Sequence, residues 1–96
     1  MADTLPLRFR MLHYLSTVDK ACADEIMKAL EAEYGTEKQF TKKVVMDHLL
    51  NMKANFIVDD NDVVLDNNRE LVIYYSINGE GRRLLRKYLP KRWNLK

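Results

Sequence analysis

Residues 55–85 decide the fold, and they read NFIVDDNDVVLDNNRELVIYYSINGEGRRLL. Apolar side chains alternate with other residues over 71–77, which is the period of a β-strand. Shorter apolar pieces precede this run at 56–58 and 63–65, and the pair Asn67-Asn68 before Arg69 suits a tight turn. We therefore expect a β-hairpin over about 57–77. Asn78 should cap a helix after it, and Pro90 should mark the end of that helix.

Two helices are predicted upstream from apolar residues at steps of three and four. The first carries Leu5, Phe9, Leu12, Leu15 and Val18 on one face, with Pro6 in its first turn. The second spans about Cys22 to Tyr34 and stops at Gly35.

A third helix has two possible starts. Thr36 with Gln39 three residues later fits a capping box, whereas Thr41 fits a cap with a hydrophobic staple between Phe40 and Val45. We favour a short first turn at Thr36 that runs into the main helix. The shared apolar face is Val45, Leu49 and Met52, with Phe56 continuing it into the core. Asn55 should end the helix in the left-handed conformation, and Leu49 should be fully buried.

Composition bounds the class of protein. The 96 residues are 47% hydrophobic and 31% charged, a balance that predicts one folded domain spanning 1–96. The start lacks the basic residues of a signal peptide and no apolar run could span a membrane, so we expect a cytoplasmic protein with no membrane partner. Cys22 is the only cysteine, which excludes an internal disulfide.

Charge is unevenly distributed along the chain. The net charge is only +2, but seven basic and no acidic residues follow Gly81, namely Arg82, Arg83, Arg86, Lys87, Lys91, Arg92 and Lys96. Residues 59–66 hold four acids and no base. The sequence thus places a basic C-terminal helix and tail (about 79–96) beside an acidic hairpin.

Three helices, a hairpin and a last helix resemble the winged helix-turn-helix of small transcription regulators. The phrase Tyr75-Ser76-Ile77-Asn78-Gly79-Glu80-Gly81-Arg82 is similar to Tyr-x-Leu-Thr-x-x-Gly-Arg in regulators of the PadR and MarR types, with Asn78 in place of the capping Thr. The resemblance implies an α+β fold with a three-helix core, a β-hairpin wing and a C-terminal helix. It also implies a homodimer that binds double-stranded DNA with helix three in the major groove.

On this resemblance, the candidate DNA-binding residues are Lys38, Gln39, Thr41, Lys42, Lys43, Asn51 and Arg69. Lys and Thr hold phosphates, while Gln and Asn pair with adenine. The alternative is a solvated helix face on which Lys43 and Asp47, four residues apart, neutralise each other. The acids behind Arg69 depart from the family pattern, because a wing that approaches phosphates normally avoids them.

Surplus apolar residues in the first and last helices suggest a surface for self-association. The expected homodimer interface comprises Met11, Tyr14, Leu85, Tyr88, Leu89 and Trp93. The alternative function is a winged-helix protein-interaction module that assembles a complex without binding DNA. We expect no enzyme and no cofactor, since His13 and His48 stand alone and no catalytic triad or phosphate loop can be assembled.

Overall fold

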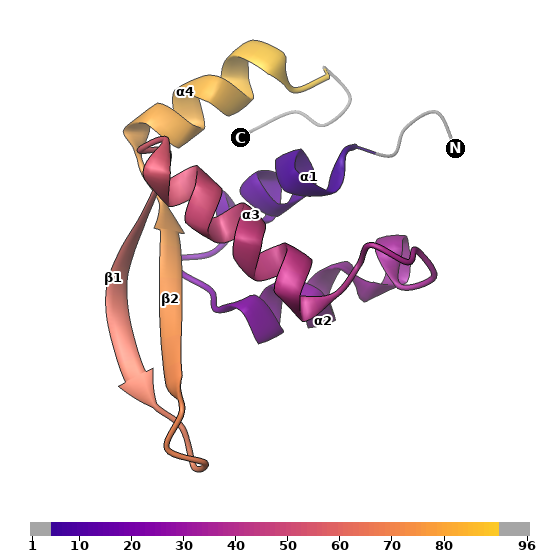
Figure 1. The fold of residues 1–96 in the computed structure, drawn as a ribbon. Coiled ribbons are helices and arrows are strands. Elements are labelled where there is room, and N and C mark those ends of the chain that lie inside the picture. The colour runs from indigo at the N-terminus through magenta and orange to yellow at the C-terminus, as the bar shows by residue number, and fades with distance from the viewer. Residues whose placement is uncertain (1–4, 91–96) are drawn as a thin grey trace.

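The computed structural model describes residues 5–90, apart from the side chain of Asn61. In this part of the chain the element order is α1 (Leu7–Leu15), α2 (Ala23–Tyr34), α3 (Lys42–Ala54), β1 (Val58–Leu65), β2 (Leu71–Ile77) and α4 (Gly79–Tyr88). The first three helices pack on one side of an antiparallel hairpin, and the hairpin loop projects away from them (Figure 1). The expected α+β class is confirmed. α4 lies at the end of the hairpin opposite that loop (Figure 1).

The start of α3 corrects our expectation. The helix begins after Thr41, whose hydroxyl accepts a hydrogen bond from the Val44 amide at 3.2 Å, and Thr36 lies in a turn outside it. Phe40 explains the outcome, because its ring stacks on Tyr34 with centroids 6.1 Å apart and packs against the core. Anchoring Phe40 immediately before the cap fixes where the chain enters the helix.

The end of α3 also differs from the prediction, because the left-handed residue is Phe56 and not Asn55. Asn55 keeps a φ of −92°, and Phe56 adopts the left-handed conformation with a φ of 63°. The Phe56 amide donates to the Lys53 carbonyl at 2.9 Å and the Ile57 amide to the Met52 carbonyl at 3.1 Å, the paired bonds of a Schellman motif. This turn sends the Phe56 side chain into solvent, where it is 77% exposed. The expected burial of Phe56 is therefore wrong.

The hairpin pairs Val58 with Ile77 at its base and Leu65 with Leu71 near its loop. The loop is closed by the Asp66 amide, which donates to the Glu70 carbonyl at 3.0 Å, and Arg69 supplies the left-handed residue with a φ of 63°. Asp66 also stabilises the loop through its Oδ1, which accepts from the amides of Asn68 and Glu70. Three-residue hairpin loops commonly place such a residue at their third position.

A single residue before α2 extends the sheet on the far side of β2. Ala21 and Tyr75 exchange both backbone hydrogen bonds at 2.9 Å, and the chain then leaves the sheet for α2. Cys22, the first residue beyond this bridge, precedes α2, and its amide donates to Glu25 Oε1 at 3.2 Å. The expected stop at Gly35 is confirmed, since α2 ends at Tyr34.

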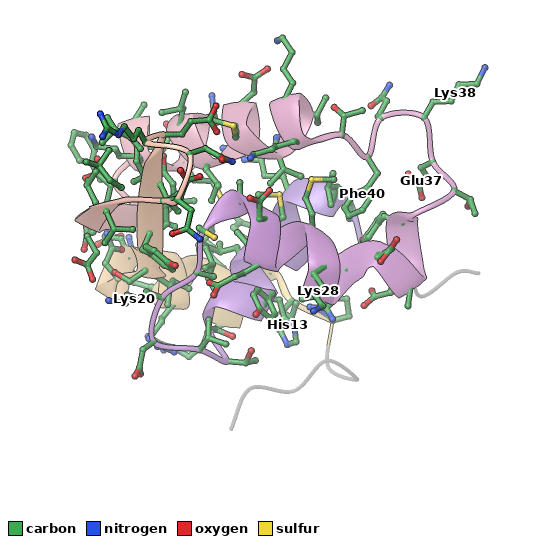
Figure 2. The ribbon with its side chains drawn as sticks, turned by 90° about the horizontal axis from the view of Figure 1, so that it is seen from below. His13, Lys20, Lys28, Glu37, Lys38 and Phe40 are labelled. Atoms are coloured by element: carbon green, nitrogen blue, oxygen red, sulfur yellow. The ribbon has the colours of Figure 1, made fainter. Side chains whose placement is uncertain are left out.

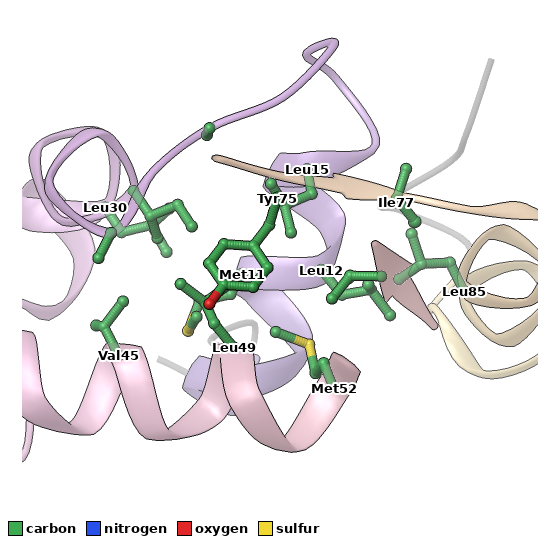
Figure 3. Close-up of a cluster of buried hydrophobic side chains, with 14 of the residues drawn as sticks. Met11, Leu12, Leu15, Leu30, Val45, Leu49, Met52, Tyr75, Ile77 and Leu85 are labelled. Carbon is green, nitrogen blue, oxygen red and sulfur yellow. The ribbon is translucent and has the colours of Figure 1, made fainter. Parts of the chain in front are cut away.

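The core lies where the three helices meet β2 and α4 (Figure 3). Leu49 is 0% exposed, which confirms its expected burial. Met11 and Leu85 are also 0% exposed, because α1 and α4 press them against the other core side chains (Figure 3). The expectation that these two residues form a dimer surface is therefore wrong.

Gly81 sets how closely α4 packs on the hairpin. Asn78 caps α4 as expected, its Oδ1 accepting from the Gly81 amide at 3.0 Å. A side chain at position 81 would collide with the Ile57 carbonyl oxygen and lie 2.6 Å from Ile77 Cγ1. The absence of a side chain thus lets the first turn of α4 rest on the base of the hairpin.

Candidate interaction surface on α3 and the hairpin

The lysines at the start of α3 are engaged by aspartates. Lys42 Nζ lies 3.1 Å from Asp24 Oδ1 on α2, and a hydrogen bond to Asp24 raises the pKa of Lys42. Lys43 Nζ lies 3.1 Å from Asp47 Oδ2 one turn along α3, as the alternative reading of this face anticipated. Both pairs are exposed, so each contributes little stability. A phosphate would have to compete with a carboxylate for either lysine.

The other predicted DNA-binding residues do not form one cluster. Lys38 and Gln39 are exposed in the loop between α2 and α3, where Lys38 points away from the molecule (Figure 2). The hydroxyl of Thr41 is occupied by its cap. Asn51 Oδ1 accepts a hydrogen bond from Asn55 Nδ2 at 3.1 Å. Arg69 lies in the hairpin loop, on a different element from the lysines.

Acidic side chains of the hairpin also form ion pairs. Asp60 Oδ2 lies 2.6 Å from Lys53 Nζ, and the hydrogen bond between them lowers the pKa of Asp60 and raises that of Lys53. Asp62 pairs with Lys20 from the segment before α2. Even so, residues 36–77, which hold α3 and the hairpin, carry seven acidic and five basic residues. This half of the protein therefore has a net charge of −2.

The outward face of α3 carries apolar side chains that the sequence analysis did not assign. Met46 is 46% exposed and Leu50 is 55% exposed. Each directly follows a core residue, Val45 and Leu49, and the two are one turn apart. Their i, i+4 spacing, next to the core residues of α3, is the sequence pattern that could have predicted a second apolar face on this helix. On the hairpin, Leu71 is 69% exposed and extends the apolar surface toward the loop.

No family model matches the chain, and no curated protein matches it either.

A groove of about 450 Å³ lies between α3, the start of α2 and β2. Its walls are mostly apolar, with Met46 and Leu49 from α3 and Leu71 and Ile73 from β2. Asp24, Lys42 and Glu70 also line it. Volumes of this size, roughly 300–1,000 Å³, are typical of sites that enclose a ligand. An apolar groove with charged groups at its sides can accept an extended chain that has apolar side chains.

The remaining candidates for a dimer interface lie near the last helix. Tyr88 is 60% exposed, and Lys87 Nζ lies 5.4 Å from the centre of its ring. Tyr14 and Leu89 are half-buried and pack against the core, which leaves only part of each on the surface. Trp93 lies outside the described residues.

The pKa of His48 is lowered, because its side chain is partly buried. Burial is the main cause of this shift, and the nearby Arg8 guanidinium adds to the effect.

Within residues 5–90, no set of histidine, cysteine or acidic side chains is arranged to bind a metal ion. The same residues contain no helix with the length and apolar character to cross a bilayer.

Proposed function

We propose that this chain is a winged-helix domain that binds another polypeptide through α3 and the hairpin, its wing. Three helices followed by a hairpin, with Ala21 bridging β2 as a one-residue third strand, support the fold. The position of α3 beside the hairpin makes these two elements the natural interaction face of such a domain.

The single observation that carries the proposal is the exposed apolar surface at the centre of this face. Met46 and Leu50 are exposed one turn apart on α3, and the apolar groove lies next to Met46. Contiguous exposed apolar groups mark protein interaction sites more often than nucleic-acid sites. The net charge of −2 over residues 36–77 also repels a phosphate backbone.

A second candidate function is sequence-specific binding of double-stranded DNA by a homodimeric transcription regulator. The observation that favours it is the group of exposed lysines, Lys38, Lys42 and Lys43, at the start of α3. With Arg69 in the hairpin loop, these side chains would contact phosphates on both sides of a major groove entered by α3. Phosphates would then displace Asp24 and Asp47 from the lysines.

Site-specific photocrosslinking in cells that express the full chain tests the polypeptide proposal. A benzophenone amino acid placed at Leu50 should form covalent adducts with a polypeptide, because this side chain lies at the centre of the face. The matched control carries the same group at Arg86, which is exposed on α4 at the end of the hairpin away from its loop (Figure 1). Adducts that are absent at position 50, or equally abundant at position 86, would refute the proposal.

Gel shifts with duplex DNA at two salt concentrations test the second candidate. If the lysines bind phosphates, replacing both Lys42 and Lys43 by alanine should lower the slope of log affinity against log salt by about two units. Lys28→Ala, an exposed lysine on α2, is the control. If the double variant binds duplex DNA as tightly as the wild type does, α3 does not enter the major groove as this candidate function requires.

A further inference from the structure

The outer edge of β2 has backbone groups that no strand pairs beyond Tyr75. The amide and carbonyl of Tyr75 point away from β1 and bond to Ala21. Since backbone groups alternate sides along a strand, those of Ile73 and Leu71 point the same way. No hydrogen bond within residues 5–90 reaches them, because Cys22 already leads away into α2. Four hydrogen-bonding groups are thus available in line with an existing bridge.

This open edge borders the apolar groove. The side chains of Leu71 and Ile73 are on the same side of the sheet as the buried Tyr75, and all three line the groove. A strand added along the edge would therefore place every second side chain against Met46 and these residues. Of the charged residues that line the groove, Asp24 and Glu70 are acidic and Lys42 is basic. The fitting occupant is a short extended segment with alternating apolar residues and a positive charge.

Residues 91–96 have these properties and read KRWNLK. In an extended chain Trp93 and Leu95 fall on one side, while Arg92, Asn94 and Lys96 fall on the other. Three of the six residues are basic and none is acidic, which complements the acids beside the groove.

Geometry favours a groove on another copy of the chain. α4 begins at the end of the hairpin opposite the loop (Figure 1), and residues 91–96 follow α4 in the chain, whereas Glu70 and Leu71, next to the loop, line the groove. Six extended residues span at most about 21 Å. β2 alone is seven residues long and spans about 20 Å from its base to Leu71. A six-residue segment would use nearly all of its length to reach the groove and would have too little left to pair along its own β2.

We propose that residues 91–96 of one copy add as a strand to the β2 edge of a second copy, with Trp93 and Leu95 in the groove, and that the exchange is reciprocal. The inference rests on the proposed function, because it uses the same face for a polypeptide and names that polypeptide. A reciprocal exchange closes on itself, so the product is a two-fold symmetric dimer.

Intrinsic fluorescence tests the proposal directly, since Trp93 is the only tryptophan in the chain. On raising the concentration of the full chain, the emission should shift to the blue together with formation of dimer in sedimentation velocity. Leu95→Asp should weaken the dimer by at least about tenfold, because it places a negative charge in an apolar groove beside Asp24 and Glu70. Asn94→Asp is the matched control, with the same added charge on the opposite side, and should change the affinity by less than about twofold.

The groove is tested from the other side by Met46→Lys, with Asn51→Lys as the control, because Asn51 is exposed on the same helix but does not line the groove. Only Met46→Lys should abolish the blue shift, and circular dichroism checks that both variants fold. Emission typical of free tryptophan at all concentrations would overturn the exchange, as would a blue shift that dilution does not alter. Crosslinks from position 50 to a different protein would still support the proposed function, so the two failures are distinguishable.

Discussion

Replacing Gly81 by alanine should destabilise the fold, whereas the same change two residues earlier should stabilise it. Both glycines lie in the first turn of α4, and alanine is favoured over glycine in helices by up to about 1 kcal/mol. At position 79 a methyl group meets no atom within 4 Å, so Gly79→Ala should raise the free energy of unfolding by about 0.5–1 kcal/mol.

At position 81 the methyl group meets the carbonyl oxygen of Ile57 and lies 2.6 Å from Ile77 Cγ1. The Ile57 oxygen is held in place, because it also accepts from the Asn78 amide at 3.3 Å. Relief therefore requires α4 to move away from the hairpin, and overpacking of this kind costs about 1–3 kcal/mol or more. Because two contacts are too close at once, we use the upper end of this range, about 3 kcal/mol. After a gain of about 1 kcal/mol in helix propensity, a net loss of about 2 kcal/mol remains for Gly81→Ala.

Thermal melts by circular dichroism measure the difference. For a chain of this size, 1 kcal/mol corresponds to about 4–8 °C, so Gly81→Ala should melt roughly 8–16 °C below the wild type and Gly79→Ala about 2–8 °C above it. Equal shifts of the two variants would refute the reasoning, because helix propensity alone would then decide both.

Three further predictions concern α3 and its ends. Thr41→Ala should lower the free energy of unfolding by about 1 kcal/mol in urea melts, while Thr36→Ala should change it by less than about 0.5 kcal/mol. A larger loss for Thr36→Ala than for Thr41→Ala would mean that α3 begins at Thr36. Phe56→Gly should stabilise the chain by about 1 kcal/mol in the same assay, because the strained residue is exposed, and a loss of stability would contradict this. Because the pKa of His48 is lowered in the folded state, the unfolded chain takes up a proton at this residue at a higher pH than the folded chain does. The free energy of unfolding should therefore fall as the pH drops below about 6.5, and His48→Gln should remove this contribution.

Much of the fold could be predicted because its signals are local. Asn78 marks the start of α4 through its side-chain cap, and the apolar period of α3 predicts the burial of Leu49 correctly. The hairpin could be predicted from the alternating apolar side chains of β2 and the polar turn before it. Each of these features depends on residues within a few positions of each other, which is what a pattern can detect.

The errors arose where distant residues compete. Phe40 stacks on Tyr34, and this contact with another helix selected the later of two plausible starts for α3. Met11 was assigned to an interface because a helix with two apolar faces suggests one, but α1 is covered on both by the rest of the core. The groove was missed because it exists only between three elements, and its residues carry no motif of their own.

The two edges of the hairpin differ in how they can grow. β1 has an irregularity in its pairing between Asp59 and Asp62, and these charged residues interrupt its ladder. Bulges and charges of this kind prevent further strands from joining a sheet. β2 is regular from Leu71 to Ile73 and has no such protection. Sheet extension is therefore favoured at one edge only, so two copies that paired β2 directly with β2 would form a closed pair with the protected β1 edges on the outside.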